Sequence, residues 1–211
     1  MISTNEWFIF GAESIDKKTC NKIKSLGKDT FKSAEVDIRR EIEQEDRKTG
    51  IPIESSVDRE TRISDVSWIM DQWVIELIWP YMLKANQSAG WSFDIRAVEY
   101  MQITKYKTGM FYDWHRDGRA DCLSLYDSPD NKFLHGYGRK LSMTVLLNNN
   151  YEGGDFQFGT FREGNNKVHT PEFNSAGSVI VFPSFMDHRV TPVTKGTRYS
   201  LVAWFVGPSF K

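Results

Sequence analysis

The spacing of apolar positions changes near residue 90 of the chain. Upstream of this point, apolar side chains recur every three or four residues, which is the period of an amphipathic helix. This pattern predicts one helix over residues 14–27 and a second, longer helix over residues 64–79. Pro80 should kink or end the second helix because it has no backbone N–H to donate. Both helices are expected to pack against a sheet.

Downstream of residue 90, short apolar runs alternate with turn residues such as Gly153 and Gly154. Many short strands at this spacing are typical of a β-sandwich or barrel. We therefore expect a single α+β, mainly β domain over residues 1–211, in which residues 1–90 give helical support and residues 91–211 form the β core. The expected strands cover residues 92–106, 109–115, 140–147, 154–161, 178–182, 187–193 and 197–206.

A charged stretch at residues 35–62 separates the two predicted helices. We expect either a solvated loop or a short polar helix followed by a loop. A long polar connection inside a compact domain often acts as a lid or a binding loop, so this stretch is a candidate lid. The alternative is plain solvated surface.

Composition and charge narrow the class of protein. Apolar residues make up 40% and charged residues 26% of the chain, which is an ordinary globular composition. Lys and Arg total 27 while Asp and Glu total 28, so there is no basic excess and no nucleic-acid partner is expected. Cys20 and Cys122 lie far apart and favour neither a disulfide scaffold nor a thiolate zinc site.

No membrane partner is expected either. The longest apolar run, at residues 74–83, contains Glu76 and Pro80 and is too short to cross a bilayer. The N-terminal residues lack the basic and apolar regions of a signal peptide. A cytoplasmic location is the default expectation, and the sequence leaves the oligomeric state open.

Two histidines and one aspartate are the candidate metal ligands. His115 and Asp117 form an H-x-D pair, and residues i and i+2 of a strand point to the same face. His188 follows an apolar run and Pro183, as expected for a residue that a different strand delivers. Two imidazoles and one carboxylate leave metal positions open and suit Fe(II) and oxygen chemistry. A zinc site more often has a further His or Cys ligand.

Arg198 is the candidate anion-binding residue. It lies on the apolar run that follows His188, and a hairpin would return it beside His188. A buried Arg requires an anion, and its guanidinium binds a carboxylate through two parallel hydrogen bonds. Ser200 faces the same side of the strand and can add a hydroxyl donor. Each residue alone has a structural explanation, but their order on β-patterned sequence favours a functional site.

The stretch from Tyr106 to Trp204 resembles the double-stranded β-helix, a cupin-like jelly roll, of the Fe(II)- and 2-oxoglutarate-dependent dioxygenases. It is most similar to the prolyl 4-hydroxylase-like branch found in animals, bacteria and viruses. Five motifs cover nearly half the chain and carry the resemblance: Y-x-x-G-x-x-Y-x-x-H-x-D from Tyr106, LSMTVLLN from Leu141, YEGGDFQF from Tyr151, GSVIVFP from Gly177 and HRVTPVTKGTRYSLVAWF from His188.

The resemblance implies that three sets of side chains meet in one site, with no catalytic residue beyond the metal ligands. These sets are the iron ligands His115, Asp117 and His188, the 2-oxoglutarate-binding residues Arg198, Tyr106 and Ser200, and the substrate-binding residues Arg139, Trp204 and Tyr112. The implied cofactors are Fe(II), 2-oxoglutarate and O2, with ascorbate as the reductant. The implied reaction hydroxylates a C–H bond and releases succinate and CO2.

The chain departs from the family pattern at three places. Leu146 stands where some relatives have a Tyr that contacts the cosubstrate. Residues 118–138 make a longer insert after H-x-D than animal enzymes have, and this insert should lie at the rim of the site. Ser200 fits an R-x-S variant better than the prolyl hydroxylase pattern.

The expected function is hydroxylation of a prolyl residue in a protein or peptide substrate. The main alternative is a hydroxylase of a free amino acid or another small metabolite. The near-neutral charge disfavours a nucleobase-repair dioxygenase. A non-catalytic, cupin-like binding module is disfavoured because all three candidate ligands and Arg198 are present.

Overall fold

The computed structural model describes residues 6–34, 36–37, 55–56, 60–118, 124–161 and 166–210. The two described helices are α1 (Lys17–Leu26) and α2 (Gln72–Ser88). The described strands are β1 (Phe8–Phe10), β2 (Lys32–Ser33), β3 (Val36–Asp37), β4 (Ser55–Ser56), β5 (Arg62–Ile63), β6 (Asp65–Ile69), β7 (Ala97–Val98), β8 (Met101–Lys107), β9 (Phe111–His115), β10 (Gly138–Leu146), β11 (Tyr151–Gly153), β12 (Phe156–Thr160), β13 (Lys167–His169), β14 (Val179–Pro183), β15 (Asp187–Val190) and β16 (Val193–Gly207).

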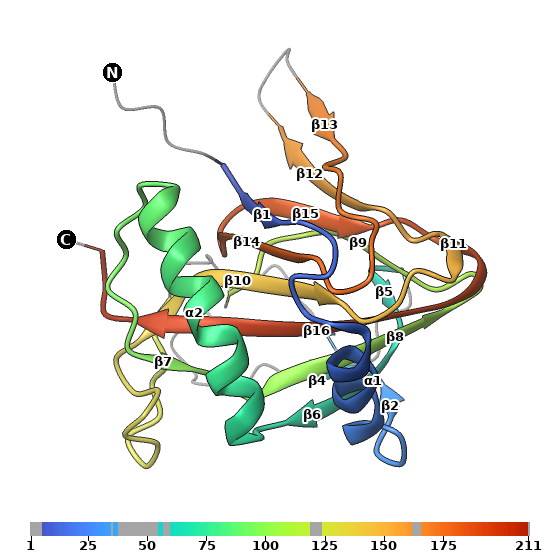
Figure 1. Ribbon diagram of the computed structural model, residues 1–211. Coiled ribbons are helices and arrows are strands. Elements are labelled where there is room, and N and C mark those ends of the chain that lie inside the picture. Colours follow the sequence, from blue (N-terminus) through green and yellow to red (C-terminus); the bar gives the residue numbers. More distant parts are fainter. Residues whose placement is uncertain are drawn as a thin grey trace.

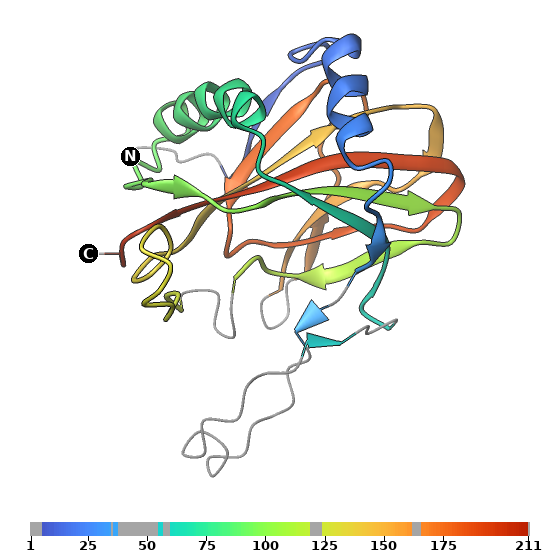
Figure 2. The ribbon, with the colours of Figure 1, turned by 90° about the horizontal axis from the view of Figure 1, so that it is seen from below.

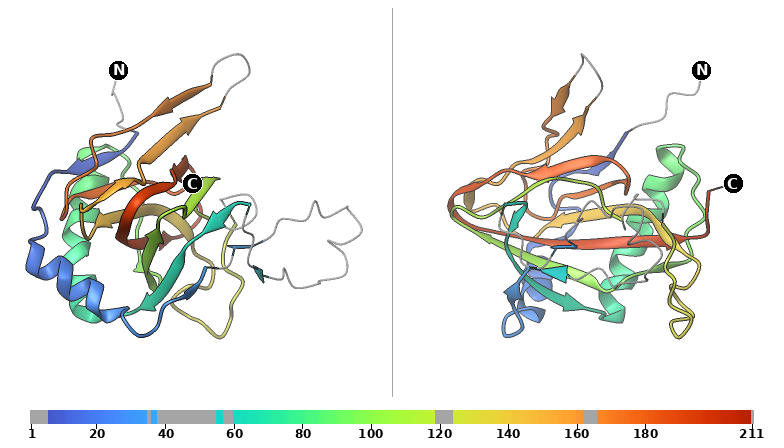
Figure 3. Two further views of the ribbon diagram at one scale, coloured as in Figure 1. Left: turned by 90° about the vertical axis from the view of Figure 1, so that its right-hand side faces the viewer. Right: turned by 180° about the vertical axis from the view of Figure 1, so that it is seen from behind.

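Two antiparallel sheets form the body of the molecule (Figure 1). The larger sheet has the order β1-β14-β10-β16-β8-β6-β2, and β7 and β11 also pair with its long central strand β16. The smaller sheet has the order β13-β12-β15-β9-β5, and its hairpin β12–β13 reaches beyond the two layers (Figure 3). The predicted mainly β class is therefore confirmed.

Strand β10 shows how the alternation of side chains builds two cores. Leu141 and Met143 point to one face of the larger sheet and pack with Ile23 of α1 and Ile78 of α2. Leu146 points to the other face and packs among residues of the smaller sheet. Both helices thus cover the outer face of the larger sheet (Figure 2), and the space between the sheets is left for the site. In the described part of the chain, no helix has the length and apolar character needed to cross a membrane.

The predicted helix over residues 64–79 is wrong in its first part. Asp65–Ile69 forms strand β6, which pairs with β8, and the helix begins only at Gln72. The apolar spacing there also fits a strand, and pairing with β8 decides between the two. The helix also does not end at Pro80, which is exposed, but continues to Ser88. The predicted first helix is confirmed as Lys17–Leu26, with Asp16 as its N-cap.

The first 90 residues contribute strands as well as helices. The sequence analysis missed β1, which pairs with β14 at the edge of the larger sheet. The candidate lid at residues 35–62 contains β3, β4 and the first residue of β5, while residues 35, 38–54 and 57–59 lie outside the described residues. The expectation of a lid therefore stays a prediction.

Cys20 is a free, buried cysteine on α1. Burial raises the pKa of its thiol, so this side chain acts as a small core residue. The other cysteine, Cys122, lies outside the described residues.

Gly177 should be essential to the stability of the larger sheet. It has a φ of +79°, and a Cβ atom there would lie 2.0 Å from the Ile15 carbonyl oxygen. The variant Gly177→Ala should lose about 1–3 kcal/mol or more of unfolding free energy, because strain and a backbone clash add. Urea unfolding followed by tryptophan fluorescence measures this loss. Gly11→Ala, whose Cβ would meet nothing within 4 Å, is the control, and equal losses would contradict the prediction.

Candidate metal centre and active site

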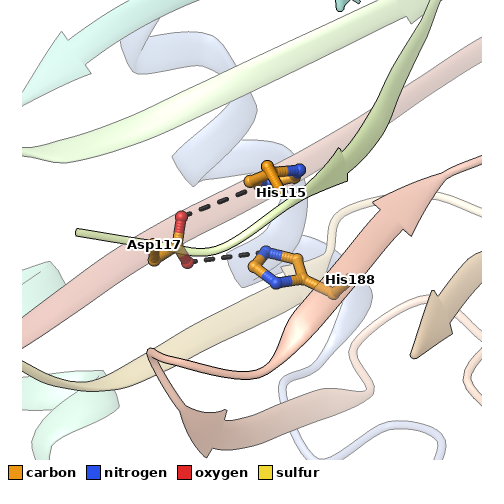
Figure 4. Close-up of side chains that lie close together, drawn as sticks. All are labelled: His115, Asp117 and His188. Carbon is orange, nitrogen blue, oxygen red and sulfur yellow. Dashed lines mark ion pairs between the residues drawn. The ribbon is translucent and has the colours of Figure 1, made fainter. Parts of the chain in front are cut away.

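Two neighbouring strands of the smaller sheet bring the predicted metal ligands together. His115 of β9 and His188 of β15 are directly opposite each other in the strand pairing. Asp117 lies just beyond β9, where its N–H donates to the Ser184 carbonyl at 2.9 Å. The His115 Nε2 atom is 3.9 Å from Asp117 Oδ1, and the His188 Nε2 atom is 3.6 Å from Asp117 Oδ2. One potential ligand atom from each residue therefore lies within 4.8 Å of the others (Figure 4).

Backbone carbonyls fix the orientation of both imidazoles. His115 Nδ1 is 2.7 Å from the Asp113 oxygen, and His188 Nδ1 is 2.9 Å from the Met186 oxygen. A carbonyl only accepts, so each Nδ1 carries the proton and each Nε2 keeps a free lone pair. Burial, and next the charge that His188 would carry if it were protonated, hold the pKa of His115 well below its usual value. This ring is thus neutral at pH 7 and ready to bind a metal.

Asp117 supplies the negative charge of the cluster. Burial alone would raise its pKa, but His188, His115 and Arg139 outweigh that effect and hold the pKa below the usual value. The carboxylate is therefore ionised at neutral pH. Two imidazole nitrogens and one carboxylate are the donor set that suits Fe(II) with open positions. Within the described ranges, this is the one group of three or more such side chains close enough to share an ion.

Aromatic rings pack around the imidazoles. The Tyr112 ring stacks on His115 with centroids 3.4 Å apart, and Phe182 contacts His188 edge-on at 4.7 Å. Burial raises the pKa of Tyr112 to about 12, so its hydroxyl remains protonated and can donate. The buried Arg62 guanidinium lies 4.5 Å from the Tyr112 ring centroid, and its Nε donates to Ser64 Oγ. The sequence analysis missed Arg62, which is the first residue of β5, because no strand was expected there.

Arg198 is a buried cation without a counter-ion. Arg198 is 1% exposed, and its Nη1 donates to Ser200 Oγ at 3.0 Å. Its Nε has no hydrogen-bond partner within the ranges that the structure describes. Among the described residues, no carboxylate lies within ion-pair distance of it. Its guanidinium is 5.6 Å from the ring of Tyr106, its neighbour on β8. An unpaired buried guanidinium is costly, so this place suits an anion.

The hairpin expected to return Arg198 beside His188 is wrong. Strand β15 belongs to the smaller sheet and β16 to the larger one, so the two residues lie on opposite layers. Tyr106 and Leu146, on the same face of the larger sheet as Arg198, pack with Val190 of β15 in the core between the layers. Arg198 therefore faces the interlayer space that also receives the imidazoles.

Arg139 and Trp204 form a second cluster on the larger sheet. The Arg139 Nε and Nη2 atoms donate to Glu99 at 2.8 and 2.7 Å, and its guanidinium lies 4.2 Å over the Trp204 ring. Burial opposes the charge of Arg139, but Glu99 outweighs it and raises the pKa of Arg139. Trp204 Nε1 is buried and has no hydrogen-bond partner in the described part of the chain. Tyr126 of the insert also donates to Glu99, at 2.7 Å.

The sequence analysis missed Glu99. A single carboxylate within the apolar run around residues 97–103 was the signal that could have found it. The insert, predicted to lie at the rim, reaches this cluster through Tyr126, while its residues 119–123 lie outside the described ranges.

Comparison with known protein families identifies the chain. Residues 101–206, which make up half of the chain, match the sequence model of the 2OG-Fe(II) oxygenase superfamily. The chain belongs to the 2OG-Fe(II) oxygenase superfamily. The matched region contains His115, Asp117, His188 and Arg198. Members of this superfamily are dioxygenases that use Fe(II), 2-oxoglutarate and O2.

A curated relative extends the comparison. The chain is 31% identical over 112 residues to a PKHD-type hydroxylase of Synechococcus sp. strain CC9605, covering 52% of this chain and 43% of that protein. It thus spans less than half the length of that relative.

The fold is shared with prolyl hydroxylases. A Pseudomonas putida prolyl-4-hydroxylase superposes with a TM-score of 0.61 at 18% identity, covering 96% of this oxygenase and 92% of that chain. A Trichoplax adhaerens prolyl hydroxylase, in complex with a hypoxia-inducible-factor peptide fragment, gives 0.58 at 18% identity, covering 96% and 84%. The predicted double-stranded β-helix is therefore confirmed.

The buried pair of Arg139 with Glu99 should contribute to the stability of this oxygenase. Glu99→Gln leaves the guanidinium without its counter-charge and should cost about 1–3 kcal/mol, less than a fully buried pair because Arg139 is partly exposed. Urea unfolding measures the change. Asp94→Asn, which breaks the exposed pair with Arg96, should change stability by less than about 0.5 kcal/mol. A loss in Asp94→Asn as large as that in Glu99→Gln would refute this assignment.

Proposed function

We propose that this chain hydroxylates a prolyl residue of a peptide or protein, using Fe(II), 2-oxoglutarate and O2 and releasing succinate and CO2. One observation carries the proposal. Two Nε2 lone pairs and one carboxylate face a common point, and the unpaired guanidinium of Arg198 faces the same interlayer space.

His115, Asp117 and His188 would hold the iron. Their neutral imidazoles and single carboxylate leave the iron site with a net charge of about +1, which favours a dianionic chelator. When bound, iron and 2-oxoglutarate together supply the oxidising power that inserts one oxygen atom of O2 into a C–H bond. The chain's own residues bind, orient and shield the reacting groups.

Arg198 would hold the far carboxylate of 2-oxoglutarate. Its free Nε and the hydroxyls of Tyr106 and Ser200 are the available donors on this face of the larger sheet. Ser200 is the cross-strand neighbour of Leu146. Since Leu146 replaces a Tyr that contacts the cosubstrate in some relatives, the Ser200 hydroxyl takes over this polar contact in our proposal.

Arg139, Trp204 and Tyr112 would bind the substrate. The rings of Trp204 and Tyr112 offer apolar walls for a pyrrolidine ring. Trp204 Nε1 has no partner among the described residues, so it can donate to a substrate carbonyl, which a peptide supplies at every residue. The prolyl hydroxylases of the same fold, one of them bound to a peptide fragment, support a peptide or protein substrate.

The test is to incubate the protein with Fe(II), 2-oxoglutarate and ascorbate, with proline-containing peptides or with free amino acids. Mass spectrometry should detect peptides that gain one oxygen atom, and the peptides should increase succinate release. The protein with His188→Ala is the control without a metal site. Oxygenation of free amino acids alone would favour a small-metabolite hydroxylase, and no succinate under any condition would favour a non-catalytic binding module.

Replacing Arg198 should weaken 2-oxoglutarate binding selectively. Arg198→Met removes the buried charge, so KM for 2-oxoglutarate should rise about 30-fold or more, equivalent to about 2 kcal/mol or more of lost binding. Initial rates of succinate release over a range of 2-oxoglutarate concentrations measure this change. Arg96→Met, at an exposed position, should leave KM unaltered. An unaltered KM in Arg198→Met would exclude this role for Arg198.

A further inference from the structure

The carboxylate of Asp117 is held by a chain of hydrogen bonds that the metal ligands alone do not explain. Ser142 Oγ lies 2.6 Å from Asp117 Oδ2, and Ser184 Oγ lies 2.9 Å from Ser142 Oγ. Both serines are 0% exposed. The backbone of Ser184 is fixed as well, because its carbonyl accepts from Asp117 N–H and its own N–H donates to the Lys140 carbonyl.

The direction of these hydrogen bonds follows from the donors available. An ionised carboxylate only accepts, so the single hydroxyl proton of Ser142 points to Asp117 Oδ2. Ser142 then has only lone pairs left for Ser184, whose hydroxyl must donate to it. A hydrogen bond to a charged acceptor is short and about twice as strong as a neutral one, which agrees with the 2.6 Å separation.

This arrangement makes the two oxygens of Asp117 unequal. Oδ2 carries the Ser142 hydrogen bond, while Oδ1 accepts no hydrogen bond from a described residue and lies on the side of His115. A carboxylate that uses one oxygen in this way binds a metal best through the other. Two imidazoles and one oxygen leave three of six positions free, whereas a carboxylate bound through both oxygens would leave only two.

In the proposed function, the three free positions would serve a chelating 2-oxoglutarate and O2. We propose that Ser142, supported by Ser184, is a positioning residue that holds Asp117 as a one-oxygen ligand and so keeps the third position free. The inference rests on the proposed function, because it assumes that iron binds to Asp117 and the two histidines.

The surroundings of Ser142 argue against a merely structural role. In the strand pairing it lies opposite Phe182 on one side and Trp204 on the other, in a strand whose residues other than Arg139 are all buried. An apolar side chain would pack well in such buried surroundings, whereas a buried hydroxyl is tolerated only when it is hydrogen-bonded. The partners that satisfy it are the carboxylate of Asp117 and the hydroxyl of Ser184.

Metal binding tests the inference without turnover. Co(II), a spectroscopic substitute for Fe(II), is titrated into the purified protein, and its visible absorption reports both affinity and coordination number. Ser142→Ala should weaken Co(II) binding about 10- to 100-fold, as expected for loss of a residue that orients a ligand, and should change the visible spectrum. Ser142→Thr keeps the hydroxyl and should bind Co(II) within about threefold of wild type.

The matched control is Ser67→Ala. Ser67 is also a buried serine paired to a hydroxyl, that of Thr30, but it packs against α1 outside the site. Its loss should leave Co(II) affinity and spectrum as in wild type. Ser184→Ala keeps the Ser142–Asp117 bond and removes only its support, so it should lose less Co(II) affinity than Ser142→Ala does. This comparison still tests the inference if Ser142→Thr is too large to fold.

The outcomes separate this inference from the proposed function. If the wild-type protein does not bind Co(II), the proposed function fails. If the wild type binds Co(II) and Ser142→Ala matches it in affinity and spectrum, the positioning role is overturned while the metal site stands. An equal loss in Ser67→Ala and Ser142→Ala would also overturn it, because the effect would then come from general destabilisation.

Discussion

The antiparallel pairing of β9 with β15 is the constraint on which the site depends. It places His115 directly opposite His188, so the two imidazoles meet although they are far apart in the chain. The same pairing leaves Asp117 just past the end of β9, where the backbone of Ser184 turns it back toward the rings. A slip of one residue in this register would send one imidazole to the outer face of the sheet.

The second physical feature of the site is the hydrogen bonding of its buried polar atoms. Most buried polar groups of the site are satisfied within the chain, as with Arg139 on Glu99 and Ser142 on Asp117. Two polar atoms are not, namely Arg198 Nε and Trp204 Nε1. Both atoms belong to residues of β16. Among the described residues, these two are the only buried side-chain nitrogen or oxygen atoms without a hydrogen-bond partner. Leaving a buried polar atom without a hydrogen-bond partner is costly, so both atoms are candidates for contact with a ligand or an ordered water.

The two faces of the larger sheet divide the tasks of stability and chemistry. Its outer face buries apolar residues under α1 and α2. Its inner face carries Ser142, Leu146, Arg198 and Ser200 toward the smaller sheet. Strict alternation along β10 and β16 makes this division possible, since neighbouring residues must point to opposite faces. Motifs that mix apolar and polar residues, such as LSMTVLLN, therefore serve both tasks at once.

The sequence by itself determined the β class, the superfamily and the candidate ligands, because side-chain alternation and the spacing of His115, Asp117 and His188 are local or motif-based signals. Only the tertiary structure decided that Asp65–Ile69 is a strand and that Arg198 and His188 lie on opposite sheets. It also decided that Glu99, Arg62 and Ser142 contact Arg139, Tyr112 and Asp117, respectively. These facts depend on strand pairing and on contacts between distant residues. Local periodicity carries no information about either.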